Sequence, residues 1–371
     1  MDHNSAIVSE ADTAIRAGKP VPFAGPPGAA VAFTVAGSRL VGTPSCAASL
    51  SGTDIVRARD EPGLGRLREF LPPWPGNAGA RPRVDVLNGF GMTIGDSLIG
   101  LQAATFLSDR ADLVLWRPNA DLHPGLARVY ELAGFETQQL PIPVADFGPT
   151  RGLWLDLSDY ALRDGFGSAN MLDYFLERLG IEPASIPAAS RAPSWLARAL
   201  PRPPAPPLDE PYVLVAAGSS QPIRSVPAIE ARALASAIID RTGIRVAGLG
   251  FDLDHRRFSK ADAWTPDFDS FAGLIASAES MISADSAPVH IAAAYNVPTL
   301  GLFTKIDPDK WIKGYSTVSG LLLDPSAPYL DSIWDESQEH RDMVAESWKR
   351  RRQDITREAL SLVTRSRRTD G

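Results

Sequence analysis

The segment MISADSAPVHIAAAYNVPTLGLF, residues 281–303, decides the fold. It begins as an apolar strand, turns sharply at Asp285, continues as a helix of small residues and ends in a second strand. Ser286 suits a helix N-cap, and Pro288 suits the first helical turn. Strand, turn, helix and strand in this order form the unit from which parallel α/β sheets are built. The segment therefore predicts a parallel sheet with a loop that presents a helix N-terminus.

The same alternation extends along most of the chain. It runs through residues 81–200 and restarts in residues 212–330. Between them, LPRPPAPPLDEP (200–211) has six prolines in twelve residues, so residues 201–211 are expected to form a stiff linker. This pattern predicts two similar α/β domains with a ligand cleft at the carboxyl ends of their strands.

The two ends of the chain have different patterns. Residues 1–80 are rich in Gly, Pro and Ala, and two stretches in them alternate apolar and polar residues as hairpin strands do. We expect a small, partly β extension there. Residues 331–371 predict a helix that carries the basic runs KRRRQ (349–353) and RSRR (365–368). These runs are either a solvated helix face or a contact with anionic lipid.

The composition excludes several classes of protein. The chain has 371 residues, of which 44% are hydrophobic and 22% charged, as in a globular protein of two domains. Its net charge of −7 argues against a general nucleic-acid binder. The single cysteine, Cys46, can form neither an internal disulfide nor a cysteine metal cluster. The polar N-terminus is unlike a signal peptide and no apolar run reaches 18 residues, so we expect a cytoplasmic protein.

Three loops carry residues that suit chemistry. In NGFGMTIGDSL (88–98), Gly91 and Gly95 would let the backbone approach a ligand. Asp96 is there either a helix N-cap or a general base in the cleft. A dinucleotide fingerprint is disfavoured, because the glycine spacing is one residue too long and the next strand ends in Arg117 rather than an acid.

The other two loops suit an anion. In AAGSSQPIRSVP (216–227), two hydroxyls and a guanidinium could bind a phosphate, although an ordinary strand–helix loop is the alternative. In residues 286–289 a helix N-terminus favours negative charge, and His290 is either a packed residue or a further contact. The candidate anion-binding residues are Ser219, Ser220, Arg224, Asp285, Ser286, Ala287, Pro288 and His290.

Two acidic triplets are alternative metal sites. Asp252-Leu253-Asp254 and Asp267-Phe268-Asp269 pair carboxylates as Mg²⁺ or Mn²⁺ sites do. Such triplets are frequent by chance, hard cations need further oxygen ligands, and the second triplet looks like a helix cap. We therefore expect no metal.

Together these loops resemble a known family. SADSAPVHIAAAYNVPTLGLFTKIDPDKW is similar to the signature of the ADP-heptose:lipopolysaccharide heptosyltransferases, glycosyltransferase family 9, with matches at Asp285, Ser286, His290, Pro298, Phe303, Asp307 and Pro308. The resemblance places Asp96 at the family's catalytic aspartate. It places Ser219, Ser220 and Arg224 at phosphate-contacting positions, and Asp252 or Asp254 near the nucleotide ribose. This chain departs from the family at three places. It has Ala287 where the family has Gly, Arg224 where the family has Lys, and Thr304-Lys305-Ile306 where the family has Gly-Pro-Thr.

The resemblance implies a GT-B fold, with two Rossmann-like domains facing across a cleft and the final helix packing back on the first domain. It implies an inverting, metal-independent transfer of a sugar from a nucleoside-diphosphate donor to a glycan or lipopolysaccharide hydroxyl. Heptose is the sugar that the resemblance favours. Asp96 would be the base, and the anion-binding loops would stabilise the leaving diphosphate. One alternative is a protein acceptor or another donor sugar, with residues 1–80 reading the acceptor. Another is a scaffold that binds the nucleotide sugar without turnover.

Overall fold

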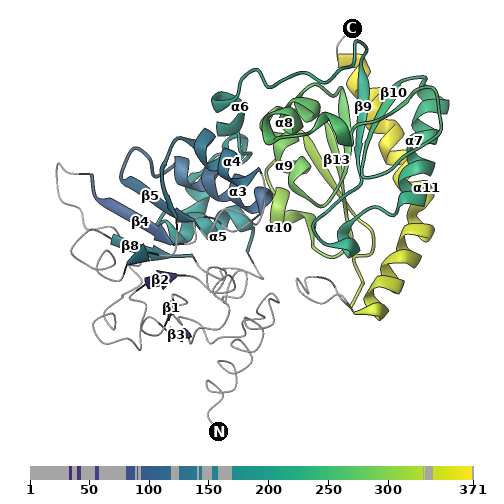
Figure 1. Cartoon of the computed structure of the whole chain (residues 1–371). Helices are drawn as coiled ribbons and strands as arrows, with labels where there is room; N and C mark the ends of the chain where they lie inside the picture. Colours follow the sequence, from purple (N-terminus) through teal and green to yellow (C-terminus); the bar gives the residue numbers. More distant parts are fainter. Residues whose placement is uncertain are drawn as a thin grey trace. The chain divides into compact units, whose positions relative to one another are not determined.

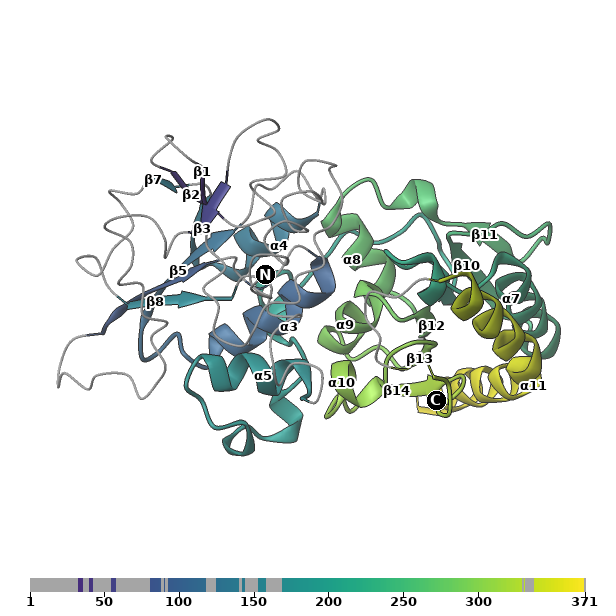
Figure 2. The same cartoon turned by 90° about the horizontal axis from the view of Figure 1, so that it is seen from below.

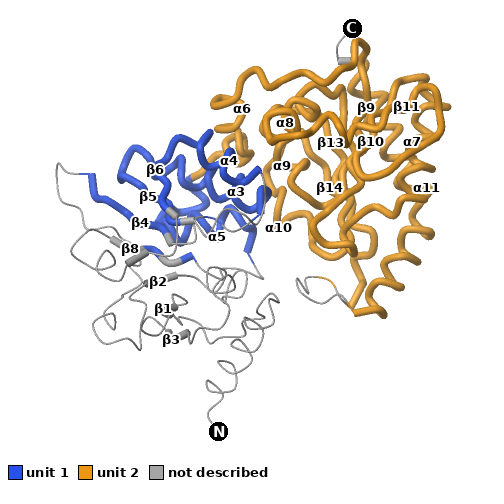
Figure 3. Tube along the Cα trace, in the orientation of Figure 1, with its two compact units in different colours: residues 1–185 blue, residues 186–371 orange. Residues whose placement is uncertain are grey.

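The computed structural model describes residues 33–35, 40–42, 55–57, 81–87, 90, 93–117, 125–139, 142–143, 153–157, 169–328, 330 and 337–369. The chain forms two compact units, residues 1–185 and residues 186–371, coloured blue and orange in Figure 3. Gly91 lies outside the described residues. The domain limits drawn from the sequence, at residues 80/81 and around the linker, stay predictions.

The second unit contains a six-stranded sheet in the order β11-β10-β9-β12-β13-β14, and every neighbouring pair is parallel (Figure 1). Its strands are β9 (Tyr212–Ala216), β10 (Arg245–Leu249), β11 (Phe258–Lys260), β12 (Ser280–Ala284), β13 (Thr299–Phe303) and β14 (Val318–Leu322). Its helices are α6 (Trp195–Ala199), α7 (Ala228–Thr242), α8 (Phe268–Ala276), α9 (Ala287–Ala294), α10 (Pro308–Ile312) and α11 (Gln338–Thr369).

The centre of this sheet is buried on both faces. Every residue of β9, β12 and β13 is buried, as the apolar runs of these strands require when helices cover both sides. The helix α9 lies against β12 and β13, and its small side chains allow that close approach. The proline-rich segment between Ala199 and Tyr212 contains neither helix nor strand, as predicted.

The last helix packs on the second unit. Trp348, only 1% exposed, lies with other apolar residues of α11 in one core with α7 and the sheet. Arg352 also donates through Nε and Nη2 to the buried Glu230 of α7, at 2.7 and 2.5 Å. Figures 1 and 2 show α11 running beside α7 from both directions. The expectation that this helix packs back on the first domain stays a prediction.

The basic run of α11 is engaged in ion pairs within the chain. Lys349 pairs with Glu346 at 2.5 Å, Arg350 with Asp324 at 2.7 Å, Arg351 with Asp354 at 3.2 Å and Arg352 with Glu230. These pairs favour the solvated-face interpretation over lipid contact. None of the described helices is both long and apolar enough to cross a membrane.

The first unit contains a parallel sheet in the order β6-β5-β4-β8. Its elements are β4 (Arg83–Leu87), α3 (Ile94–Thr105), β5 (Asp112–Arg117), α4 (Leu126–Ala133), β6 (Glu136–Gln139), β8 (Leu153–Asp156) and α5 (Met171–Arg178). A second sheet, in the order β3-β1-β2-β7, is antiparallel and consists of β1 (Phe33–Val35), β2 (Leu40–Gly42), β3 (Ile55–Arg57) and β7 (Ile142–Pro143). Strands therefore occur in the N-terminal extension, as the alternating pattern predicts.

Candidate functional site

The loops predicted to bind an anion meet at one edge of the C-terminal sheet. Because β9, β12 and β13 are parallel neighbours, the loops that follow them leave the sheet at the same edge. These loops begin at Ala217, Asp285 and Thr304, respectively. The sequence separates them by 68 and 19 residues, whereas the fold makes them neighbours.

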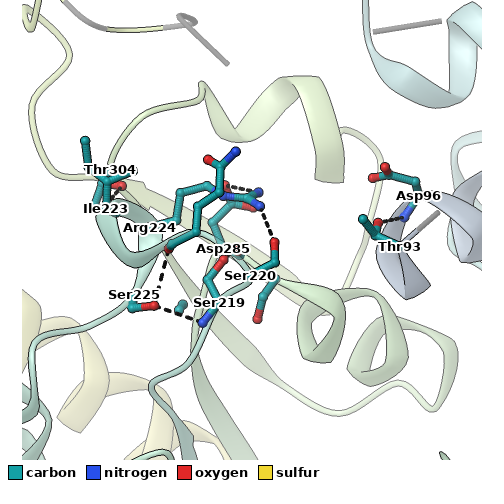
Figure 4. Close-up of polar contacts among 12 residues, drawn as sticks. Thr93, Asp96, Ser219, Ser220, Ile223, Arg224, Ser225, Asp285 and Thr304 are labelled. Carbon is teal, nitrogen blue, oxygen red and sulfur yellow. Dashed lines mark hydrogen bonds and ion pairs between the residues drawn. The ribbon is translucent and has the colours of Figure 1, made fainter. Parts of the chain in front are cut away.

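An ion pair lies at the centre of this edge (Figure 4). The Arg224 Nη1 atom is 3.4 Å from the Asp285 Oδ2 atom, and Arg224 Nη2 donates to the Ser220 hydroxyl at 2.9 Å. The Asp285 side chain is only 4% exposed and that of Arg224 is 18% exposed. A buried carboxylate and a hydroxyl thus hold the guanidinium in one orientation.

Three hydroxyls tie the loops to one another. The Ser219 hydroxyl donates to the Asp285 carbonyl at 3.0 Å, and the Ser286 hydroxyl donates to the Gly218 carbonyl at 2.9 Å. Thr304 donates in the same way to the Ile223 carbonyl at 3.0 Å. The protons of these hydroxyls are therefore used inside the protein. Ser220 differs, because its oxygen accepts from Arg224 and, among the contacts of the described residues, its own proton has no acceptor.

The N-terminus of α9 borders the ion pair. Ser286 has the N-cap position, but its hydroxyl does not cap the helix. Pro288 has no N–H, and the Val289 N–H donates to the Ser286 carbonyl at 3.1 Å. Within the part of the chain that the structure describes, the amides that remain for an anion are those of Ser286 and Ala287, fewer than the sequence predicts.

His290 lies under the surface of the site. Its side chain is buried, with 6% of the residue exposed, and its Nδ1 atom is 3.1 Å from the Tyr315 hydroxyl oxygen. Burial and, as the smaller cause, the positive charge of Arg224 together lower the pKa of His290 to about 4. The imidazole is therefore neutral near pH 7, which favours the packed-residue alternative over a charged contact. Sequence reasoning missed Tyr315, which lies 25 residues further along the chain.

The predicted ribose acids lie in the loop after β10. Asp252 and Asp254 are both exposed, and the Asp252 carboxylate accepts from the Leu253 amide at 2.8 Å. The same loop contains Gly250, whose φ of +82° favours glycine and whose N–H donates to the Asp262 carboxylate at 3.0 Å. Asp262 is thus a further acid at this edge that sequence reasoning missed.

The described residues do not form a metal site. Asp267 caps α8 by accepting from the Ser270 amide at 2.7 Å, as the helix-cap interpretation predicts. In the part of the chain that the structure describes, no three His, Cys, Asp or Glu side chains are grouped to hold a metal ion.

Asp96 lies in the first turn of α3, in the first unit. Thr93 is the N-cap of this helix, and its hydroxyl accepts from the Asp96 amide at 3.3 Å (Figure 4). The N-cap interpretation of Asp96 is therefore wrong, whereas the general-base interpretation stays a prediction. Gly95 is buried within the same turn.

Comparison with known proteins supports the family. Residues 265–327, from just before α8 to beyond β14, match the family model of Glycosyltransferase family 9 (heptosyltransferase). Over these residues the chain is similar to glycosyltransferase family 9. This similarity supports a glycosyltransferase, in agreement with the signature after β12. No curated protein sequence matches the chain.

Solved structures similar to this chain show its fold. The iron-containing dodecameric glycosyltransferase TibC from enterotoxigenic E. coli H10407 has a TM-score of 0.51 at 15% identity, over 78% of this chain and 77% of that one. A second TibC structure, an iron-containing heptosyltransferase in complex with ADP-D-β-D-heptose, has a TM-score of 0.51 at 16% identity over the same shares. The predicted GT-B fold is thereby confirmed. The iron belongs to TibC, and the described residues of this chain offer no ligand set for it.

Proposed function

We propose that this glycosyltransferase transfers a heptose from a nucleoside-diphosphate donor to a hydroxyl of a glycan or lipopolysaccharide-type acceptor. ADP-heptose is the donor that we favour. The observation that carries the proposal is the guanidinium of Arg224, held by Asp285 and Ser220 beside the N-terminus of α9. A fixed guanidinium, a hydroxyl proton and helix amides form a donor set for a diphosphate. The ADP-heptose bound by TibC supports this choice of donor.

In the proposed reaction, Asp96 accepts the proton of the acceptor hydroxyl while that oxygen attacks the anomeric carbon of the donor. The bond from this carbon to the diphosphate breaks, and the diphosphate leaves with the electron pair. Attack opposite the leaving group inverts the anomeric carbon. Negative charge gathers on the diphosphate, where Arg224, Ser220 and the amides of α9 stabilise it. We propose no metal in this step, because these fixed groups supply the required positive potential.

Arg224 acts here more by orientation than by net charge. Its pairing with the buried Asp285 cancels much of its long-range attraction for anions, but the planar guanidinium keeps donors in a fixed geometry. Ser219 and Ser286 would then shape the loops through their bonds to backbone carbonyls, and Ser220 would meet the phosphate.

Donor binding is tested first with the purified full chain. ADP, GDP, UDP and dTDP are titrated in separate thermal-shift series, with Mg²⁺ and with EDTA. A ligand at about 100 times its dissociation constant stabilises the protein by about 2.7 kcal/mol, which raises the melting temperature visibly. Stabilisation by ADP in EDTA supports the proposal, and stabilisation that requires Mg²⁺ contradicts the metal-free scheme.

Turnover is tested with Asp96→Asn. Loss of a general base lowers kcat by about 10²–10⁴-fold, while the dissociation constant of ADP stays near that of the wild type. Asp109→Asn, which changes an exposed acid just after the same helix, is the matched control and retains activity. Wild-type turnover in Asp96→Asn would refute its role as the base. ADP binding by a wild-type chain that transfers no sugar to glycan or protein acceptors would favour the scaffold.

A further inference from the structure

The candidate site contains a buried pair that the proposed chemistry does not use. His290 of α9 and Tyr315, which precedes β14, meet through the His290 Nδ1 atom and the tyrosine hydroxyl, 3.1 Å apart. Their rings are edge to face, with centroids 5.8 Å apart and planes at 88°. Both residues are buried, and Tyr315 packs with Val289, Ala293, Phe303 and Ile312. Such a pair holds an imidazole in one orientation.

The hydrogen bonds of this pair decide the tautomer of His290. In the described part of the chain, the Tyr315 hydroxyl has one hydrogen-bond partner, the Nδ1 atom. Burial raises the pKa of Tyr315, so the hydroxyl keeps its proton. A buried O–H proton needs an acceptor, and here the acceptor is Nδ1. Because the imidazole is neutral, its own proton is then on Nε2.

The Nε2 atom is the part of His290 left for a ligand. Among described contacts the Nε2 atom makes no hydrogen bond. Some buried polar atoms are shielded from solvent and also lack a partner, but Nε2 is not one of them. His290 is the fourth residue of α9, and helical side chains lean toward the helix N-terminus, where the Arg224 pair lies. Arg224 pairs with Asp285, which directly precedes Ser286, the N-cap residue of α9. The positive charge of Arg224 also contributes to the lowered pKa of His290.

Tyr315 is itself held in place. The Arg191 Nε atom donates to the Lys313 carbonyl at 3.2 Å, two residues before the tyrosine. Between them, Gly314 has a φ of +89°, and a Cβ there would lie 2.5 Å from the Arg191 Cδ atom. The Tyr315 amide also donates to the Ile312 carbonyl at 2.9 Å. These contacts fix the backbone from which the hydroxyl reaches His290.

We propose that Tyr315 is a positioning residue that holds His290 as the Nε2–H tautomer, so that His290 offers a neutral N–H donor to the diphosphate beside Arg224. This inference rests on the proposed function. A neutral donor binds the diphosphate without the desolvation cost of a second buried cation. Tyr315 acts on the ligand only through His290.

The tautomer is measured first, on full-length protein with ¹⁵N-labelled histidine. The chain has five histidines, and His290→Gln identifies the His290 signals in a two-bond ¹H–¹⁵N spectrum. The wild type is expected to show a protonated Nε2 and an unprotonated Nδ1. In Tyr315→Phe, which keeps the ring and removes the hydroxyl, His290 is expected to show a mixture of tautomers. A wild-type Nδ1–H tautomer, or an unchanged spectrum in Tyr315→Phe, would overturn the inference.

Binding is measured by calorimetric titration of ADP into the same proteins. Tyr315→Phe is expected to weaken ADP binding about 5–30-fold, the effect of losing one well-oriented hydrogen bond to a charged group. Tyr295→Phe is the matched control, since it removes a hydroxyl that donates to the Leu200 carbonyl at 2.8 Å, just past the other end of α9. That variant should bind ADP as the wild type does.

A double variant separates positioning from general damage. If Tyr315 acts through His290, then Tyr315→Phe combined with His290→Gln binds ADP no more weakly than His290→Gln alone. Additive losses, or wild-type affinity in Tyr315→Phe, would overturn the inference. A wild type that binds none of ADP, GDP, UDP and dTDP would refute the proposed function and this inference with it. The wild-type titration thus separates failure of the proposed function from failure of the inference about Tyr315 alone.

Discussion

The burial of a neutral His290 makes the stability of the second unit depend on pH. Its pKa is lowered to about 4, first by loss of solvation and then by the charge of Arg224, whereas an imidazole in the unfolded chain has a pKa of about 6.5. Between these values the unfolded chain binds a proton that the folded unit does not. Stability therefore rises with pH across this window, is complete above about pH 6.5, and is lost as the pH falls toward 4.

The size of this effect follows from the shift. A difference of about 2.5 pKa units corresponds to about 3 kcal/mol, of which about 2 kcal/mol is lost between pH 7 and pH 5. Tyr315, which faces the imidazole, does not offset this loss, because its raised pKa keeps the hydroxyl protonated over this range.

The assay compares pH 7 with pH 5 in urea, following amide exchange in peptides of residues 212–330. Reading these peptides keeps unfolding of the first unit out of the measurement. In His290→Gln, the loss of about 2 kcal/mol in unfolding free energy between pH 7 and pH 5 should disappear, whatever the absolute stability of the variant. His255→Gln, which removes an imidazole that accepts from the Arg257 amide, is the matched control. An equal decline in the wild type and in His290→Gln between pH 7 and pH 5 would refute the reasoning.

Two further predictions concern packing in the second unit. Gly273→Ala places a Cβ 1.8 Å from the Pro204 carbonyl oxygen, so α8 and the proline-rich segment must separate. We expect the free energy of unfolding in urea titrations to fall by about 1–3 kcal/mol. Ser270→Ala on the same helix should not show this loss. Trp348→Ala empties a site between α11 and α7 and should cost about 3–5 kcal/mol, seen as faster amide exchange in the second unit only. Faster exchange in β4 and β5 as well would mean that α11 also supports the first unit.

The central elements of both sheets follow from local pattern, and the edges do not. The strands β9, β12 and β13 are continuous apolar runs, so sequence alone predicts them as buried parallel strands. The strand β11 has only three residues, Phe-Ser-Lys, and the apolar residues of β14, Val-Ser-Gly-Leu-Leu, are interrupted by Ser-Gly, so neither gives a clear strand signal. Both are edge strands, where one neighbour and partial solvent exposure relax the pattern.

For a related reason, the sequence did not predict which surface α11 packs against. The periodic apolar residues of this helix, among them Trp348 and Val363, predict that one face is buried. They carry no information on which surface covers it. The ion pair of Arg352 with Glu230, 122 residues apart, helps to select α7, and such a pairing becomes visible only in the fold.

Within the site, the order of the loops was predictable and the pairing of their side chains was not. Adjacent parallel strands bring Arg224 and Asp285 to one edge, which sequence reasoning anticipates. Their direct pairing changes what the site offers an anion, because a guanidinium that already faces a buried carboxylate contributes geometry rather than net charge. The remaining attraction must then come from dipoles, namely the Ser220 hydroxyl, the amides that begin α9 and the N–H of a neutral His290. In the proposed reaction, groups of this kind would stabilise the charge that develops on the leaving diphosphate and would hold the released diphosphate less tightly than free cations would, which suits product release.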